Sequence, residues 1–304
     1  MGVIEIAMTV MWTVAAGAMA LYVAKVAGEV TYVTLADGRR EARALPLVFK
    51  LLLPFCPNLD SLVRRKAFDG QIALAERRLV AAGFEGLLSG REFIELKLLV
   101  PVVFGLAFAV VVFLAGSIVP DSFLASLRLP LVFLGFALGY LQPIAWLSGA
   151  LRRRHAEIVK ALPFVLDILT LSVEAGMDFI SALQRNCASR RLDALNEELL
   201  RMTKEIQVGS SRKTALKAMA DRVGEPNLRS VAFALVQADE LGVSIGSILR
   251  IQSEQLRSRR FDLAEKKANE APTKMLAPLM LCIFPAVFII LLVPVLTQAL
   301  KGIF

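Results

Sequence analysis

One segment of the chain has the residue types of a phosphate-binding loop. Residues 209–214 read GSSRKT, and a Lys-Thr pair of this kind can bind the phosphates and magnesium ion of a nucleotide. Such a loop needs a second glycine directly before the lysine, so that backbone amides can approach the phosphate, and Arg212 occupies that place. We therefore interpret the segment as the end of one helix at Gly209 and the start of another at Ser211.

Nucleophilic and metal-ligating residues are few and scattered. Cys56, Cys187 and Cys282 lie far apart without CxxC spacing, so we expect them to be small apolar packing residues. The only histidine, His155, follows three arginines, and we interpret it as an interfacial cation or a neutral surface residue. The chain also has no HExxH or GxSxG motif. The sequence predicts no enzyme activity, no cofactor and no catalytic or metal-binding residues.

Carboxylates on otherwise apolar helix faces are the next candidates for a site. They are Asp167, Glu174, Asp239 and Glu240, and the last two precede a turn at Gly242. They could be helix-end charges or partners of Arg and Lys. Alternatively, some could form a partner contact or a cation site, because a partly buried carboxylate must be paired. Both interpretations stay open, and we take these four residues and Gly242 as a candidate partner interface.

A second candidate interface is basic. Five cations lie together near the membrane end of one long predicted helix: Arg257, Arg259, Arg260, Lys266 and Lys267. Such a cluster could contact an acidic partner or lipid head groups. It could equally be the solvated or lipid-facing side of the helix.

The elements that position these residues belong to a largely apolar protein. Hydrophobic residues make up 56% of the chain and mean hydropathy is +0.62, above the range of ordinary soluble domains. Four apolar segments are each close to the ~20 residues that cross a bilayer as a helix. They are Ile6–Ala27, Leu98–Val119, Leu129–Ser148 and Met275–Leu300. We expect an all-α membrane protein with about four transmembrane helices.

The distribution of charge predicts the orientation in the membrane. Residues 1–5 contain no Lys or Arg, whereas the basic flanks lie in residues 29–95 and 151–274. By the positive-inside rule these flanks are cytoplasmic and both termini lie outside, which places Lys301 on the outer side. The net charge of +8 fits juxtamembrane clusters such as Arg152–Arg154 that meet lipid. The polar regions lack interleaved aromatic residues, and this argues against nucleic-acid binding.

The polar stretch between the third and last apolar segments predicts six helices and no strand. The expected helices cover about 156–175, 178–189, 193–208, 211–224 and 227–241, with a long sixth from 244 toward the last apolar segment. Asp178, Asp193 and Ser244 are expected to be N-caps, and Pro226 suits a first turn. Loops of two to four residues make successive helices antiparallel, which predicts a compact bundle.

The expected domain organisation follows from these elements. It comprises a first transmembrane helix (1–28), a cytoplasmic or interfacial helical segment (29–95), a transmembrane hairpin (96–149), the cytoplasmic bundle (150–274) and a C-terminal transmembrane helix (275–304). Within the second part, residues 44–55 predict an interfacial helix. Residues 71–82 predict an amphipathic helix that ends at Gly83, with Ile72, Leu74 and Leu79 on its apolar side.

The apolar segments themselves contain packing signals. Gly135 and Gly139 form a GxxxG step suited to close helix contact. Pro278, Pro285 and Pro294 are expected to kink the last segment. A transporter usually shows ionisable residues at mid-membrane or duplicated sets of spans, and neither is visible in the sequence.

Several segments together resemble a known family. LPFVLDILTLSVEAGMDFISAL (162–183), followed by ADELGVSIGSILRIQSEQLR (238–257), is similar to the type II secretion F domain, the six-helix cytoplasmic module of pilus and secretion platform proteins. RRLVAAGF (77–84) before the second span, and APTKMLAPLMLCIFPAVFIILL after a single domain, resemble the Tad pilus branch and most of all its TadC-like member.

The resemblance implies a non-enzymatic inner-membrane platform protein of a Tad-type (type IVc) pilus or type II secretion-like machine. Its implied partners are a hexameric secretion ATPase, pilin subunits and membrane lipid. Type II members with two such domains differ from this chain, which has one, so pairing with a second copy or a sister TadB-like subunit is also implied. The alternative is a subunit of a multi-span transporter or channel.

Overall fold

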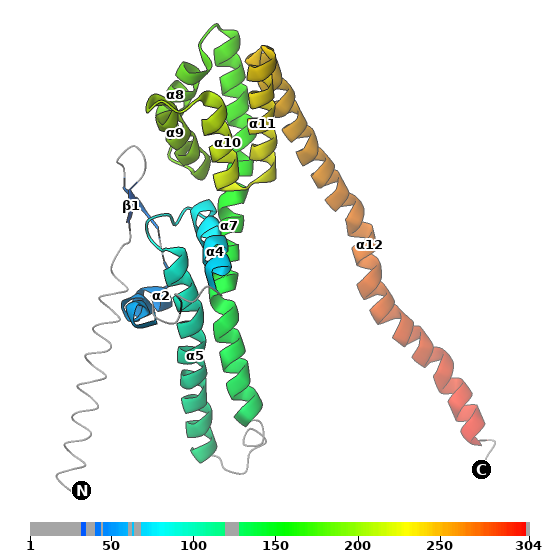
Figure 1. Cartoon of the computed structure of the whole chain (residues 1–304). Coiled ribbons are helices and arrows are strands. Elements are labelled where there is room, and N and C mark those ends of the chain that lie inside the picture. The colour runs from blue at the N-terminus through cyan, green and yellow to red at the C-terminus, as the bar shows by residue number, and fades with distance from the viewer. Residues whose placement is uncertain are drawn as a thin grey trace, which may run out of the picture.

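The computed structural model describes residues 32–34, 40–43, 45–59, 63, 68–118 and 128–301 (Figure 1). Its elements are β1 (Tyr32–Thr34), β2 (Arg40–Ala42), α2 (Leu47–Leu52), the 3-10 helix η1 (Leu53–Leu59), α4 (Asp69–Ala81), α5 (Gly90–Ile118), α7 (Arg128–Glu174), α8 (Phe179–Ser189), α9 (Ala194–Gln207), α10 (Arg212–Val223), α11 (Pro226–Leu241) and α12 (Ile245–Lys301). The first expected transmembrane segment, Ile6–Ala27, and both chain termini lie outside the described residues.

The strands β1 and β2 differ from the expected helical character of residues 29–95. They pair antiparallel, with Tyr32 opposite Ala42 and Thr34 opposite Arg40. The first strand reads YVT, and aromatic and β-branched residues of this kind favour strands. The sequence between the strands contains Asp-Gly, a dipeptide typical of hairpin turns. A local signal for this hairpin was therefore present in the sequence.

A first core lies where α4 packs on α5 and on the early part of α7. Phe49, Leu79 and Leu96 are fully buried there. The Trp146 ring packs against the rings of Phe49 and Phe84, each with centroids 4.9 Å apart. α4 confirms the expected helix, and of the residues expected on its apolar side Leu79 is buried whereas Leu74 is 52% exposed. Its neighbour one position on, Ala75, is buried instead.

Two helices are long and apolar enough to cross a membrane among the described residues. They are Gly90–Val110 within α5 and Ile245–Pro294 within α12. The first begins before the expected Leu98, because α5 starts at Gly90 and continues as a helix through residues 91–97, four of which are charged. The expected segment Leu129–Ser148 forms the first part of α7. The described residues thus contain two candidate spans, whereas the sequence predicts about four transmembrane helices.

The polar stretch forms a six-helix bundle from the second half of α7, α8 to α11 and the start of α12. The predicted N-caps Asp178 and Asp193, and Ser211 at the predicted start of the fourth helix, each accept a hydrogen bond from a backbone N–H in the first turn of the helix that follows. α12 begins at Ile245, directly after the expected N-cap Ser244. Glu225 caps α11 in the same way, which the sequence reasoning missed. The core buries apolar side chains from every helix, including Leu166, Leu183, Leu195, Met202, Leu216, Leu235 and Leu249.

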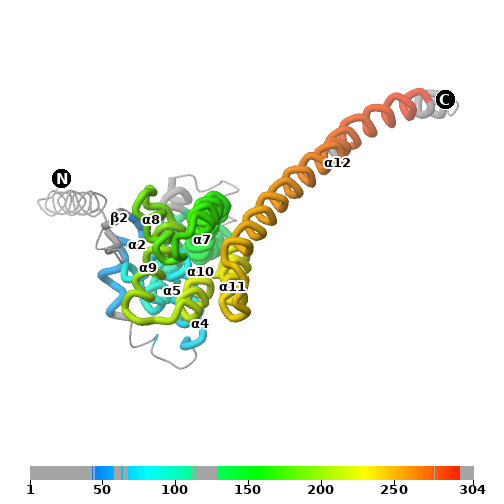
Figure 2. The backbone as a smooth tube through the Cα atoms, turned by 90° about the horizontal axis from the view of Figure 1, so that it is seen from above, coloured from blue at the N-terminus to red at the C-terminus, as the bar shows by residue number. Residues whose placement is uncertain are grey.

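Two helices run without interruption from the bundle into apolar segments. α7 is 47 residues long and α12 is 57 residues long, so no loop separates the bundle from the expected spans at residues 149 or 275. The free ends of α5, α7 and α12 point to the same side of the bundle (Figure 1). Seen from above, α12 leaves the other helices (Figure 2). Leu256 is the last buried residue of α12 before this free part.

Candidate functional site: the distal end and the charged junction

Three turns lie at the end of the bundle that points away from the α5–α7 hairpin (Figure 1). They join α7 to α8, α9 to α10 and α11 to α12, and contain Gly176, Gly209 and Gly242. Gly242 has φ +67°, a left-handed conformation that ends α11 and favours glycine. We call this surface the distal end. Its short turns leave helix ends open to contact from outside.

Exposed ion pairs connect the helices of the distal end. Arg212 lies between Asp178 and Asp239, at 3.5 and 3.6 Å. Lys213 pairs with Glu240 and, through its hydrogen bond, holds the pKa of that carboxyl below its ordinary value. Because exposed pairs add little to stability, these charges are free to exchange their partner for one on another protein.

The carboxylate on α7 at the distal end is also paired. Glu174 accepts hydrogen bonds of 2.7 and 2.8 Å from Arg250 of α12. The structure thus gives Glu174, Asp239 and Glu240 basic partners, as the first interpretation of these residues expects. Their exposure leaves the second interpretation, a partner contact, open.

Large apolar side chains stand exposed beside these charges. Val208 and Leu241, each one residue before a turn glycine, are 89% and 76% exposed. Leu171 and Val243 lie on the neighbouring helix end and turn and are also exposed. Apolar side chains rimmed by charged residues are typical of protein interfaces. The sequence reasoning selected the charges here and missed the apolar residues, although their position before Gly209 and Gly242 was readable.

The structure divides the predicted basic cluster of α12. Arg257 donates to Asp167 of α7, which also accepts from Ser253. Arg259 donates to Asn227 at 3.0 Å, and Arg260 donates to the carbonyl of residue 159 at 2.5 Å. These three arginines thus have partners on the bundle and remain exposed. Lys266 and Lys267 lie beyond that contact, exposed on the free part of α12.

A group of buried charges lies at the opposite end of the bundle. Arg154 of α7 donates to Glu197 at 2.8 Å and to Glu198 at 2.9 Å. Arg222 of α10 donates to Glu198 at 2.9 Å, and Arg43 pairs with Glu197 at 2.5 Å. We call these five residues the charged junction. It joins the chain before α2 to three helices of the bundle.

The sequence interpretation of Arg154 as a lipid-facing cation is wrong. Its side chain is only 7% exposed, whereas Arg152 and Arg153 are exposed. Burial alone would lower the pKa of Arg154, but the carboxylates of Glu197 and Glu198 outweigh burial and hold that pKa above its ordinary value. Helical phase could have revealed the burial, because Arg154 lies four residues before Ile158 on the core side of α7.

His155 beside it is half-buried. Its Nε2 lies 2.9 Å from the carbonyl oxygen of Val223 at the end of α10. Cys56 and Cys187 are buried, as expected of packing residues, whereas Cys282 is exposed on α12. Among the described residues no group of three or more His, Cys, Asp or Glu side chains could hold a metal ion.

The predicted glycine and proline positions lie toward the free ends of the helices. A Cβ built on Gly135 would lie 2.6 Å from Cβ of Phe108, and one on Gly139 would lie 2.8 Å from Cα of Pro101. Both glycines thus face α5 at close approach. α12 runs through Pro278, Pro285 and Pro294 as one helix.

Comparison with known proteins identifies a family that resembles part of the chain. Residues 165–293, from the second half of α7 to the apolar part of α12, match the family type II secretion system (T2SS), protein F. No curated protein and no solved structure matches the chain. Platform proteins of this family are not enzymes, and they pair with a secretion ATPase at the inner membrane. Residues 165–293, which comprise most of the six-helix bundle and the apolar part of α12, are thus similar to T2SS protein F, a family of platform proteins of secretion and pilus machinery.

Proposed function

We propose that this protein is the TadC-like platform subunit of a Tad-type pilus machine. In this role it couples a cytoplasmic hexameric secretion ATPase to the extraction of pilin from the membrane and to filament assembly. The single F domain, followed directly by a long helix into an apolar segment, supports this branch of the family. The protein performs no chemistry itself and transmits motion.

The observation that carries the proposal is the continuity of α7 and α12. Both helices begin or end at the distal end and extend into apolar segments on the same side of the bundle (Figure 1). A helix is stiff along its axis, because each turn is hydrogen-bonded to the next. A displacement of the distal end therefore moves two membrane helices without a loop that would absorb it.

This arrangement supports the expected topology. The apolar segments Leu98–Val119, Leu129–Ser148 and Met275–Leu300 enter the inner membrane together, and Ile6–Ala27 is the fourth span. The bundle then lies in the cytoplasm and both termini lie outside. The proposed domain boundaries are those expected from the sequence: 1–28, 29–95, 96–149, 150–274 and 275–304.

The free part of α12 supports pairing with another subunit. The apolar window of α12 has no residue buried against the rest of the chain, and it leaves the α5–α7 hairpin unaccompanied. Membrane helices associate through close packing and hydrogen bonds between helices. We propose that a second copy of this chain or a sister TadB-like subunit packs beside α12 and supplies the second F domain of the platform.

The distal end is the proposed contact with the ATPase, with Asp239, Glu240 and Gly242 at its centre. It combines exposed apolar residues with weakly held ion pairs, and such a surface suits a contact that forms and breaks in each cycle. Lys266 and Lys267 lie toward the membrane and are proposed to contact acidic groups of the sister subunit or lipid.

Co-purification tests the contact. The full chain, the sister subunit and the candidate ATPase are expressed together, purified in detergent, and weighed as a complex. Glu240→Lys and Leu241→Ser should each abolish ATPase retention while the two membrane subunits stay together. Asp221→Lys is the matched control, because Asp221 also lies in an exposed pair, 3.2 Å from Arg229, at the other end of α10.

The outcomes separate the function classes. Loss of the ATPase in both distal variants and retention in the control would support the coupling role. A lone particle that binds neither partner would overturn it and would favour a transporter or channel subunit. Equal retention in all variants would place the ATPase contact elsewhere on the platform.

A further inference from the structure

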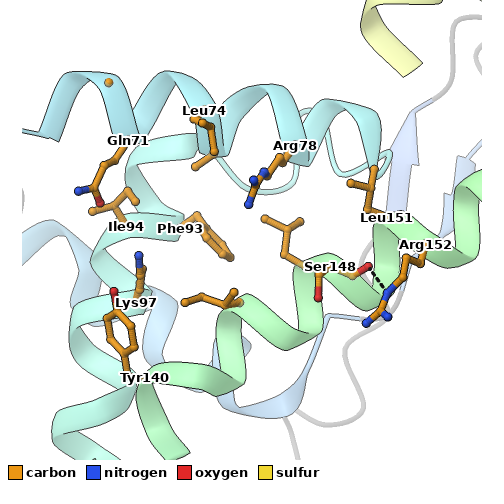
Figure 3. A pocket seen from close by; sticks show the side chains of 14 residues that line it. Gln71, Leu74, Arg78, Phe93, Ile94, Lys97, Tyr140, Ser148, Leu151 and Arg152 are labelled. Atoms are coloured by element: carbon orange, nitrogen blue, oxygen red, sulfur yellow. Dashed lines mark hydrogen bonds between the residues drawn. The ribbon is translucent and has the colours of Figure 1, made fainter. Parts of the chain in front are cut away.

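A cavity of about 610 Å³ lies between α4, α5 and α7 (Figure 3). Its volume is within the range of about 300–1,000 Å³ typical of ligand pockets. It is remote from the distal end, since it is formed where α4 packs on the α5–α7 hairpin. Arg78 enters it from α4 and Lys97 from α5, and Arg152 lies at one end beside Ser148 (Figure 3).

The charges of this cavity are of one sign. Arg78, Lys97 and Arg152 are its charged lining residues, and no Asp or Glu lines it. Among the residues that the structure describes, none of the three cations lies within salt-bridge distance of a carboxylate. Lys97 lies 4.9 Å above the centre of the Tyr140 ring, and Arg152 donates to the Ser148 carbonyl at 3.3 Å. Three cations around one cavity favour an anionic ligand.

The rest of the cavity wall is apolar. Phe93 and Ile94 of α5, Leu147 of α7 and Leu74 of α4 line it. A ligand that fills this space therefore needs an anionic group and a hydrocarbon part in one molecule. Free phosphate or a sugar phosphate would leave the apolar wall uncovered.

The cavity lies at one end of the apolar segments. Lys97 belongs to the candidate span Gly90–Val110, and Tyr140 belongs to the segment expected to cross the membrane as part of α7. Lys, Arg and Tyr are the residues that gather where a membrane meets water. Basic pockets between helices at this level bind the head groups of anionic lipids.

We propose that this cavity binds one anionic phospholipid, with its phosphate held by Arg78 and Arg152 and its first hydrocarbon carbons against the apolar wall that leads toward Lys97. The bound lipid would cross-link α4 to the α5–α7 hairpin, because the cavity is lined by all three helices. This inference does not depend on the coupling role proposed for the distal end.

Native mass spectrometry of the full chain tests the proposal. The protein is purified in a neutral detergent, then titrated separately with palmitoyl-oleoyl phosphatidylglycerol and with palmitoyl-oleoyl phosphatidylcholine. We expect one molecule of the anionic lipid to bind at least about tenfold more tightly than the zwitterionic one. Each basic residue near an anionic lipid contributes about 1 kcal/mol, which is roughly fivefold in affinity.

Matched variants test the assigned residues. Arg78→Gln and Arg152→Gln should each weaken phosphatidylglycerol binding roughly fivefold, and the double variant roughly thirtyfold. Arg91→Gln and Arg153→Gln remove the same charge from α5 and α7 outside the cavity and should leave binding unchanged. Leu74→Trp keeps every charge but fills the space, and it should also prevent binding. The melting temperature of each variant identifies any that fails to fold.

Three results would overturn the proposal. Equal affinity for the two lipids would show that charge does not select the ligand. Equal effects in the cavity variants and the controls would show that binding is a property of the whole surface. Full displacement of phosphatidylglycerol by inorganic phosphate would show that the cavity binds a free anion and does not select a lipid.

Discussion

Replacing Arg154 by methionine tests whether the charged junction holds the bundle to the membrane-side helices. The substitution keeps a long side chain in the same space and removes the guanidinium. Two hydrogen bonds are lost, to Glu197 at 2.8 Å and to Glu198 at 2.9 Å. Because Arg154 is buried, water cannot fully replace it.

The geometry sets the expected magnitude. Removing one partner of a buried ion pair costs about 3–5 kcal/mol when the other charge is left alone. Here Glu197 keeps Arg43, and Glu198 keeps Arg222 at 2.9 Å. The expected loss is therefore at the low end of that range, about 3 kcal/mol. At about 2–4 °C per kcal/mol, this lowers the melting temperature by roughly 6–12 °C.

Tryptophan fluorescence provides the assay. The chain has two tryptophans, and Trp12→Phe leaves Trp146 as the only reporter. Its ring packs against Phe84 and Phe49, in the core below the junction. Heat unfolding of the full chain in detergent, followed by this signal and by circular dichroism, gives the stability of the membrane-side core and the helices together.

Two further variants separate the ion pair from general damage. Arg153→Met is the control, since Arg153 is the exposed neighbour on α7, and its effect should stay within about 0.5 kcal/mol. Combining Arg154→Met with Glu198→Gln should cost less than the sum of the single changes by about 1.5 kcal/mol. The reasoning would be refuted if Arg154→Met and Arg153→Met had the same small effect, or if the double variant were strictly additive.

Three other outcomes can be checked on the full chain. Gly139→Leu should destabilise the α5–α7 hairpin by about 1–3 kcal/mol in heat unfolding, because its Cβ would lie 2.8 Å from a backbone atom of α5. Gly149→Leu is the control, since a Cβ there would meet nothing within 4 Å, and equal losses in the two variants would contradict the close approach at Gly139. The hydrogen bond from Arg201 holds the pKa of Glu85 below its ordinary 4.5, so this pair stabilises the folded protein above pH 4.5, and the stabilisation is lost as the pH falls through the lowered pKa of the folded state. Glu85→Gln should therefore flatten the decline of the melting temperature in acid, and an unchanged profile would count against the pair. Burial raises the pKa of Cys187 to about 11, which leaves roughly one thiol in 1,000 ionised at pH 8. Peptide mapping should therefore find that alkylation of Cys187 is slow in the native protein and fast after denaturation.

The helix ends of the bundle could be predicted because their causes are local. Asp178, Asp193 and Ser211 cap helices through hydrogen bonds that span two or three residues. Gly209 ends α9 with hydrogen bonds to the turn before it, and the GSSRKT segment is the helix boundary that the sequence predicted. A missing phosphate-loop glycine was enough to exclude the nucleotide site, since that requirement is also local.

The partners of the candidate residues could not be predicted in the same way. Asp167 meets Arg257, and Glu174 meets Arg250, across separations of 90 and 76 residues. The sequence identified both members of the Asp167 pair as candidates but assigned them to separate surfaces. Which charges meet depends on how α12 packs on α7, and no pattern within either helix contains that information.

Hydropathy and short-range hydrogen bonding were thus sufficient to predict the six bundle helices and the apolar segments within α5, α7 and α12. Both act between residues that are close in sequence, so the order of residues alone determines them. The charged junction, the cavity between α4, α5 and α7, and the separation of α12 from the hairpin were decided by the tertiary structure. Arg43 and Glu197 are 154 residues apart, and only folding brings such residues together and excludes water from between them.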